Sequence, residues 1–146
     1  MKHWLIDKHK NNIEILNLSS KELRFNIHRS GLYEMADEGN TYNSVFKWDS
    51  IIPSYSFFYD FEGIEEALPM FFHKSLLCAQ KDILVETSSE LPILRMTTSY
   101  FSDNCMDFID ANHGMGSIAI TGNEKLLLEF TDDCKHMLFS NFKIKT

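Results

Sequence analysis

The sequence predicts an α+β fold in which an antiparallel or mixed sheet packs against about two helices. Three observations predict this class: strand-like segments separated by turns near the C-terminal end, a helical apolar pattern in the middle, and no regular strand–helix alternation. Regular alternation would instead favour a doubly wound parallel sheet. The chain has 146 residues, and no internal repeat or low-complexity linker divides it. We therefore expect residues 1–146 to form a single domain, with helices covering one face of the sheet.

The clearest strand signal lies in the last 30 residues. Strand-like segments at 117–121, 125–130 and 135–143 are separated by turn formers at Gly122-Asn123 and Thr131-Asp132-Asp133. Short strands joined by such turns are typical of consecutive hairpins. The sequence therefore predicts a C-terminal three-stranded antiparallel meander.

The N-terminal region gives two competing signals. Leu23, Phe25 and Ile27 alternate with polar residues, which is typical of a half-buried strand. Ser19 followed by Glu22 matches a capping box, which would begin a helix instead. We give the alternation more weight and expect a β-hairpin within residues 12–29, followed by a long loop over 30–44.

The middle of the chain changes from strand to helix. Residues 55–61 are aromatic enough for a strand. From Glu62 onward the apolar period becomes helical, and Pro69 should kink or split the helix. The shared helical face comprises Ile64, Ala67, Leu68, Phe71, Ser75, Cys78 and Ala79.

Two further strands and a second helix are expected next. The strands cover 83–86 and 92–100, and Ser102 is a suitable N-cap for a helix over 103–112. The helix should bury Cys105, Phe108 and Ile109. Spacing of i, i+4 and i+7 places three carboxylates on its solvent side, those of Asp103, Asp107 and Asp110.

The net charge of −7 is unevenly distributed. Residues 1–30 contain six Lys or Arg and three acids, whereas residues 31–80 contain two Lys and eight acids. Nucleic acid and anionic lipid bind clustered Lys and Arg, so the sequence predicts neither partner. An acidic surface instead attracts a basic protein, although acidity that serves only solubility is the alternative.

Several features predict a cytoplasmic protein without a membrane segment. No apolar stretch approaches the roughly 20 residues that span a bilayer, and Asp7 and Lys8 interrupt any N-terminal secretory segment. Cys78, Cys105 and Cys134 are odd in number and lack zinc-site or CxxC spacing. Such cysteines fit free thiols in a reducing compartment.

No motif predicts catalysis, a metal site or a cofactor. The chain lacks a GxSxG elbow, an HxH or HExxH pair, an EF-hand loop and a phosphate-binding loop. Cys105 and His113 are the nearest candidates for a nucleophile and its base, but a core thiol and a helix-end histidine explain them better. We therefore expect a protein that is not an enzyme.

An aromatic segment with interspersed acids, 42–61, suggests a contact surface. Tyr and Trp are preferred anchors of protein interfaces, and neighbouring acids would select a basic partner. Within it Phe57 and Phe61 are expected to be core. A partner-binding surface would combine this segment with the carboxylates of the second helix. The predicted partner-binding residues are Trp48, Tyr55, Tyr59, Asp60, Glu62, Asp103, Asp107 and Asp110.

In overall character the chain resembles the small acidic immunity proteins of bacterial contact-dependent growth inhibition and other polymorphic toxin systems. The resemblance rests on acidity, the aromatic–acidic segment and the lack of catalytic motifs, and it carries over no individual residue. It implies a non-catalytic inhibitor of a basic toxin domain, many of which are nucleases. The alternatives are a small-molecule-binding or enzymatic domain with a Phe-lined pocket, and a self-associating structural subunit.

Overall fold

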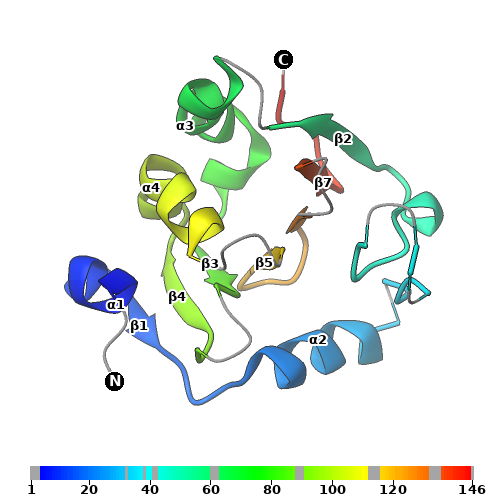
Figure 1. The fold of residues 1–146 in the computed structure, drawn as a ribbon, viewed down its shortest axis with the longest axis horizontal. Helices are drawn as coiled ribbons and strands as arrows, with labels where there is room; N and C mark the ends of the chain where they lie inside the picture. The colour runs from blue at the N-terminus through cyan, green and yellow to red at the C-terminus, as the bar shows by residue number, and fades with distance from the viewer. Residues whose placement is uncertain are drawn as a thin grey trace.

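A computed structural model describes residues 4–31, 33–37, 39–40, 43–59, 63–87, 91–111, 116–131 and 136–145. Its centre is a seven-stranded sheet in the order β1-β4-β3-β5-β6-β7-β2, with every pairing antiparallel (Figure 1). The α-helices are α1 (Trp4–His9), α2 (Ser20–Arg29), α3 (Ile64–Lys74) and α4 (Thr98–Asp110). The strands are β1 (Glu14–Ile15), β2 (Tyr55–Phe58), β3 (Asp82–Val85), β4 (Leu94–Thr97), β5 (Ser117–Thr121), β6 (Leu127–Phe130) and β7 (Met137–Ser140). Two 3-10 helices, η1 (Trp48–Ser50) and η2 (Leu76–Ala79), complete the described elements. The predicted α+β class is confirmed.

The C-terminal meander is also confirmed, because β5, β6 and β7 pair consecutively and antiparallel. The first turn is at Gly122-Asn123, where the Gly122 amide donates to the Asp82 carbonyl at 3.1 Å. A Cβ at Gly122 would lie 2.1 Å from the Asp82 carboxylate, so a larger residue here would force the Asp82 side chain to move. Asp132 and Asp133 of the second predicted turn lie outside the described residues.

Both faces of the sheet are covered, not one. Figure 1 shows α1, α3 and α4 on one side and α2 on the other. Alternate strand residues divide accordingly: Leu128 and Leu138 join the core under α3 and α4, whereas Leu127 and Phe139 join the core under α2 and segment 33–51. The central strands are buried on both faces, and they therefore form continuous apolar runs.

The predicted hairpin over 12–29 is wrong. Only Glu14 and Ile15 form a strand, β1, and Ser20–Arg29 forms helix α2. The capping box begins this helix: Ser19 Oγ accepts from the Glu22 amide, and the Glu22 side chain accepts from the Ser19 amide, each at 3.1 Å. Leu23 and Ile27, one helical turn apart, are buried, whereas Phe25 is 59% exposed.

Other element boundaries differ locally. The predicted helix after Glu62 is α3, which contains Pro69 without interruption and ends at Lys74; Cys78 lies in η2. The predicted strand 92–100 ends at Thr97, whose side chain caps α4 by accepting from the Tyr100 amide at 3.1 Å. Ser102 is therefore not the N-cap but a buried residue inside α4. The predicted buried face of this helix, Cys105, Phe108 and Ile109, is confirmed.

Candidate functional site

Two of the predicted aromatic contact residues are buried, which corrects that part of the predicted surface. Trp48 is 5% exposed, stacks on Phe139 at 5.6 Å between ring centroids, and belongs to the core on the α2 side. Tyr59 is also 5% exposed and packs edge-to-face on Phe130. Large aromatic rings can pack in a hydrophobic core or at a protein interface, and these two rings pack in the core.

The remaining aromatic and acidic candidates of that segment are differently placed. Tyr55, on the edge strand β2, is 42% exposed, and its role as a contact residue stays a prediction. Asp60 and Glu62 lie outside the described residues, as does Phe61. Because Trp48 and α4 pack on opposite faces of the sheet, the structure does not combine them into one surface.

The three acids of α4 lie on its solvent side as predicted. Asp103 and Asp110 are exposed, and the Asp107 side chain is 29% exposed. Asp107 also anchors α1, because its Oδ2 accepts from Lys8 Nζ at 2.7 Å and from His9 Nε2 at 2.9 Å. Burial raises the pKa of Asp107, but the hydrogen bonds from Lys8 and His9 outweigh burial and hold it below its ordinary value.

A second exposed row lies on the neighbouring helix α3. Glu66, Met70 and His73 are spaced i, i+4 and i+7, and all three are exposed. His73 Nε2 contacts Asp103 Oδ1 at 2.6 Å, which joins this row to α4. We call the combined surface the helical acidic surface, and it comprises Glu66, Met70, His73, Asp103, Asp107 and Asp110.

The charges at the C-terminal end of α4 oppose the helix dipole. Asp107 and Asp110 occupy the last turn, and α4 has no basic residue there. Acids at this end cost typically about 0.3–1 kcal/mol each at an exposed position, because the partial charge of the helix terminus is also negative. At Asp107 the ion pairs with Lys8 and His9 of α1 offset this cost.

A buried ionic cluster on the opposite side of the sheet was not predicted. Glu86, 1% exposed, forms a two-pronged contact with Arg24: Nε to Oε2 at 2.7 Å and Nη2 to Oε1 at 2.6 Å. The Ser20 hydroxyl donates to the same carboxylate. A buried carboxylate needs such partners. The cluster therefore fastens α2 to the sheet.

Glu129, on β6, fastens segment 33–51 in a similar way. It is 2% exposed and accepts from the Val45 amide at 2.6 Å, the Phe46 amide at 3.2 Å and Trp48 Nε1 at 2.9 Å. Burial raises the pKa of Glu129 to about 7, although these donors and the charge of Arg24 oppose the rise. Its position in the apolar run 126–130 was the sequence signal that could have identified it.

Cavities accompany these anchors on the α2 side. One of about 270 Å³ is lined by Arg24, Val45 and Glu129 among others. A larger one of about 450 Å³ lies between segment 36–56 and β7, and Phe46, Trp48 and Phe139 line it. The second is the aromatic-lined space that a small-molecule-binding domain would require.

The sequence analysis also did not identify one cluster of potentially reactive side chains. Cys78 Sγ lies 3.5 Å from His73 Nδ1, and His73 in turn contacts Asp103. The sequence pointed to Cys105 instead, which is 1% exposed and whose pKa burial raises to about 12. Cys105 is thus a core thiol, and its proposed partner His113 lies outside the described residues.

Among the described residues, no group of three or more His, Cys, Asp or Glu is arranged to hold a metal ion. No helix in the described ranges has the length and apolarity needed to cross a membrane. No protein-family model matches the chain, and no curated protein matches it significantly.

Proposed function

We propose that this protein is a non-catalytic inhibitor that binds a basic protein partner, most specifically an immunity protein that neutralises a bacterial toxin in the cytoplasm. The observation that carries the proposal is the helical acidic surface. It joins the acids of α4 and α3 through the contact of His73 with Asp103 at 2.6 Å. A nuclease toxin is a suitable target, because its cleft must be basic to bind a phosphate backbone.

Charge alone would give steering but not a stable complex, since a lasting interface also needs apolar area. The helical acidic surface contains such area in Met70, which is 49% exposed. Leu76, on the adjoining η2, is 62% exposed. Apolar side chains beside carboxylates are the combination that an interface core and its polar rim require.

The position of the charges on α4 supports a cationic partner. Asp107 already has Lys8 and His9 of α1 as partners. Asp103 is 61% exposed, and Asp110 is exposed in the last turn, where α4 has no basic residue. An Arg or Lys of a partner would therefore contact Asp103 and Asp110, and at Asp110 it would also offset the unfavourable helix dipole.

The test is the rate of association with a cognate basic toxin domain. We expect the association rate constant to fall at least about tenfold from low salt to about 0.5 M salt, because the ions screen the steering charges. The double variant Asp103→Asn/Asp110→Asn should associate several-fold more slowly at low salt. The matched control Glu34→Gln/Asp49→Asn removes two exposed charges from segment 33–51 and should associate like wild type.

No detectable association with basic toxin domains would reject this function, and two other results would reject parts of it. An association rate that does not respond to salt would remove electrostatic steering. Equal rates for the α4 double variant and its control would move the interface away from the helical acidic surface.

The aromatic-lined cavity of about 450 Å³ favours a second candidate, a small-molecule-binding domain. Filling this space with Ser56→Trp, on the exposed part of its lining, would abolish ligand binding but leave toxin binding unchanged. A thermal-shift screen with and without this substitution distinguishes the two candidates.

A further inference from the structure

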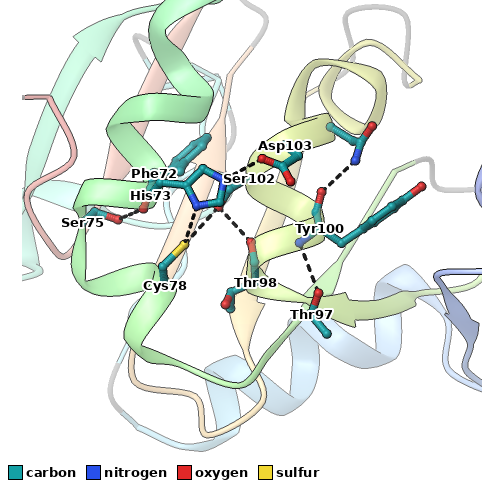
Figure 2. Close-up of polar contacts among 10 residues, drawn as sticks. Phe72, His73, Ser75, Cys78, Thr97, Thr98, Tyr100, Ser102 and Asp103 are labelled. Carbon is teal, nitrogen blue, oxygen red and sulfur yellow. Dashed lines mark hydrogen bonds and ion pairs between the residues drawn. The ribbon is translucent and has the colours of Figure 1, made fainter.

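The three side chains of Cys78, His73 and Asp103 form a row on the α3–α4 side of the molecule. Figure 2 shows the Cys78 sulfur directed at Nδ1 of His73, and the opposite ring nitrogen directed at the Asp103 carboxylate. The two distances are 3.5 Å from Sγ to Nδ1 and 2.6 Å from Nε2 to Oδ1. The imidazole thus separates the thiol from the carboxylate. Because each ring nitrogen faces a different partner, the three groups do not converge on a common point as metal ligands would.

A sharp change of direction in the chain brings Cys78 to His73. His73 is in the last turn of α3, and Ser75 ends that helix by donating its hydroxyl to the Phe72 carbonyl at 2.7 Å. The same Oγ accepts from the Leu77 amide at 3.1 Å and begins η2. The resulting turn returns Cys78 to the histidine five residues earlier, so the pair depends on this local cap and not on a flexible loop.

Ser102 provides a second polar neighbour for the thiol. Its Oγ lies 3.5 Å from Cys78 Sγ and donates to the Thr98 carbonyl at 2.8 Å, one turn earlier in α4. A hydroxyl carries one proton, which it can direct either to that carbonyl or to a sulfur anion. A negative sulfur at this position would therefore have two donors, Ser102 and the protonated His73.

The arrangement is suited to proton transfer from sulfur to imidazole. With the Nε2 proton donated to Asp103, the lone pair of Nδ1 faces the thiol and can accept its proton. The carboxylate then stabilises the imidazolium, and the imidazolium stabilises the thiolate. The order of nucleophile, base and orienting acid is that of activated nucleophiles in general. The thiolate, not the thiol, is the reactive form of cysteine.

Exposure favours exchange with a small disulfide over catalysis of acyl transfer. Acyl transfer needs donors directed at a developing oxyanion in a site that excludes water. Here the His73 and Asp103 side chains are 38% and 61% exposed, and Cys78 is partly exposed. The cavities lined by Trp48 and by Glu129 lie on the other face of the sheet. Thiol–disulfide exchange requires only an accessible, stabilised thiolate.

We propose that Cys78 is an activated thiol that forms a mixed disulfide with low-molecular-weight disulfides of the glutathione class. The Cys78 thiolate attacks one sulfur of the disulfide, a new S–S bond forms, and the original S–S bond breaks. The second sulfur leaves as a thiolate and takes the proton that His73 received from Cys78. A reduced small thiol reverses the reaction by the same steps. This modification site does not depend on the proposed inhibitor function.

The test uses the full chain with Cys134→Ser, which leaves Cys78 and Cys105 as its two thiols. The protein is incubated with oxidised glutathione at pH 7, and intact mass and peptide mapping follow the modification. We expect one glutathione on Cys78 and none on the buried Cys105. A free thiol is only a few per cent thiolate at pH 7, so His73→Ala should slow the reaction about tenfold. Asp103→Asn should slow it less, and the control Lys74→Ala, which removes a neighbouring exposed charge, by less than about twofold.

Circular dichroism of each variant separates loss of reactivity from loss of fold. Unchanged reaction rates in folded His73→Ala and Asp103→Asn proteins would overturn the proposal. A Cys78 that reacts no faster than free glutathione would also overturn it. Repeated turnover of a thioester that depends on Cys78 would replace the modification site with a catalytic one.

Discussion

Replacing Glu129 with glutamine is expected to change how the stability of the protein depends on pH. Glu129 Oε1 accepts from the Phe46 amide and Trp48 Nε1, and Oε2 accepts from the Val45 amide. A glutamine can keep the first two bonds, but its NH2 group would then face the Val45 N–H. A buried donor without an acceptor costs about 1–3 kcal/mol. The substitution also removes a charge from the core.

The sign of the pH effect follows from the pKa of Glu129, which burial raises to about 7 from 4.5. Between these values the folded state binds more protons than the unfolded state, so stability falls as pH rises. This contribution is fully present below pH 4.5 and is lost as pH rises through 7. At 1.36 kcal/mol per pKa unit, the total change is about 3 kcal/mol.

The measurement is urea unfolding followed by tryptophan fluorescence, in steps from about pH 5 to pH 8, for wild type and Glu129→Gln. We expect the variant to be less stable at pH 5 and this deficit to shrink by about 2.5 kcal/mol, or reverse, by pH 8, because part of the total change lies below pH 5. The exposed control Glu34→Gln should differ from wild type by a small amount that does not change with pH. A deficit for Glu129→Gln that stays constant with pH would refute the reasoning, because the other titrating groups cancel in the difference.

Two further substitutions test the elements that the sequence did not predict. Arg24→Met leaves the buried Glu86 without its two-pronged partner and should destabilise the protein by about 3–5 kcal/mol in urea, and the double variant Arg24→Met/Glu86→Leu should recover much of this loss. A loss below about 1 kcal/mol would contradict the role of Arg24 as the required partner of a buried charge. Ser19→Ala removes the cap of α2 and should cost about 1 kcal/mol, whereas Ser19→Asp, which retains an acceptor, should cost less. Equal effects of the two Ser19 variants would contradict the role of the cap.

The meander was predictable because short strand-like segments and the turn formers between them are local signals. The Gly122-Asn123 turn lies directly between the two segments that it joins, and its length sets the register in which they pair. The same is true of the buried face of α4, which the spacing of Cys105, Phe108 and Ile109 predicts. Both correct predictions depend only on residue spacing within one short segment of the chain.

The error at α2 arose from the weight given to two local signals. Alternation at Leu23, Phe25 and Ile27 requires all three on one buried face, yet Phe25 is 59% exposed. Two of the three residues are separated by four positions and fit a helical face equally well. The capping box adds hydrogen bonds to the helix that the strand alternative lacks. A specific polar pairing was therefore better evidence than a short apolar period.

The polar clusters were beyond prediction because their partners are distant in sequence. Glu129 meets Trp48 across 81 residues, and Glu86 meets Arg24 across 62. His73 meets Asp103 across 30 residues, from a different helix. No periodicity within one element indicates such pairs. Trp48 was therefore assigned to the surface from its residue type, although its indole N–H has a buried acceptor.

The two faces of the sheet use carboxylates in opposite ways. On the α2 side, Glu86 and Glu129 are buried and hold α2 and segment 33–51 to the strands by hydrogen bonds. On the α3–α4 side, Asp103 and Asp110 are exposed, and apolar packing of the helices fixes their positions. Neutralising the first pair should therefore reduce stability, and neutralising the second should leave stability nearly unchanged. If the proposed function is right, the second change alone reduces the rate of partner association, so comparing the two pairs separates binding from folding.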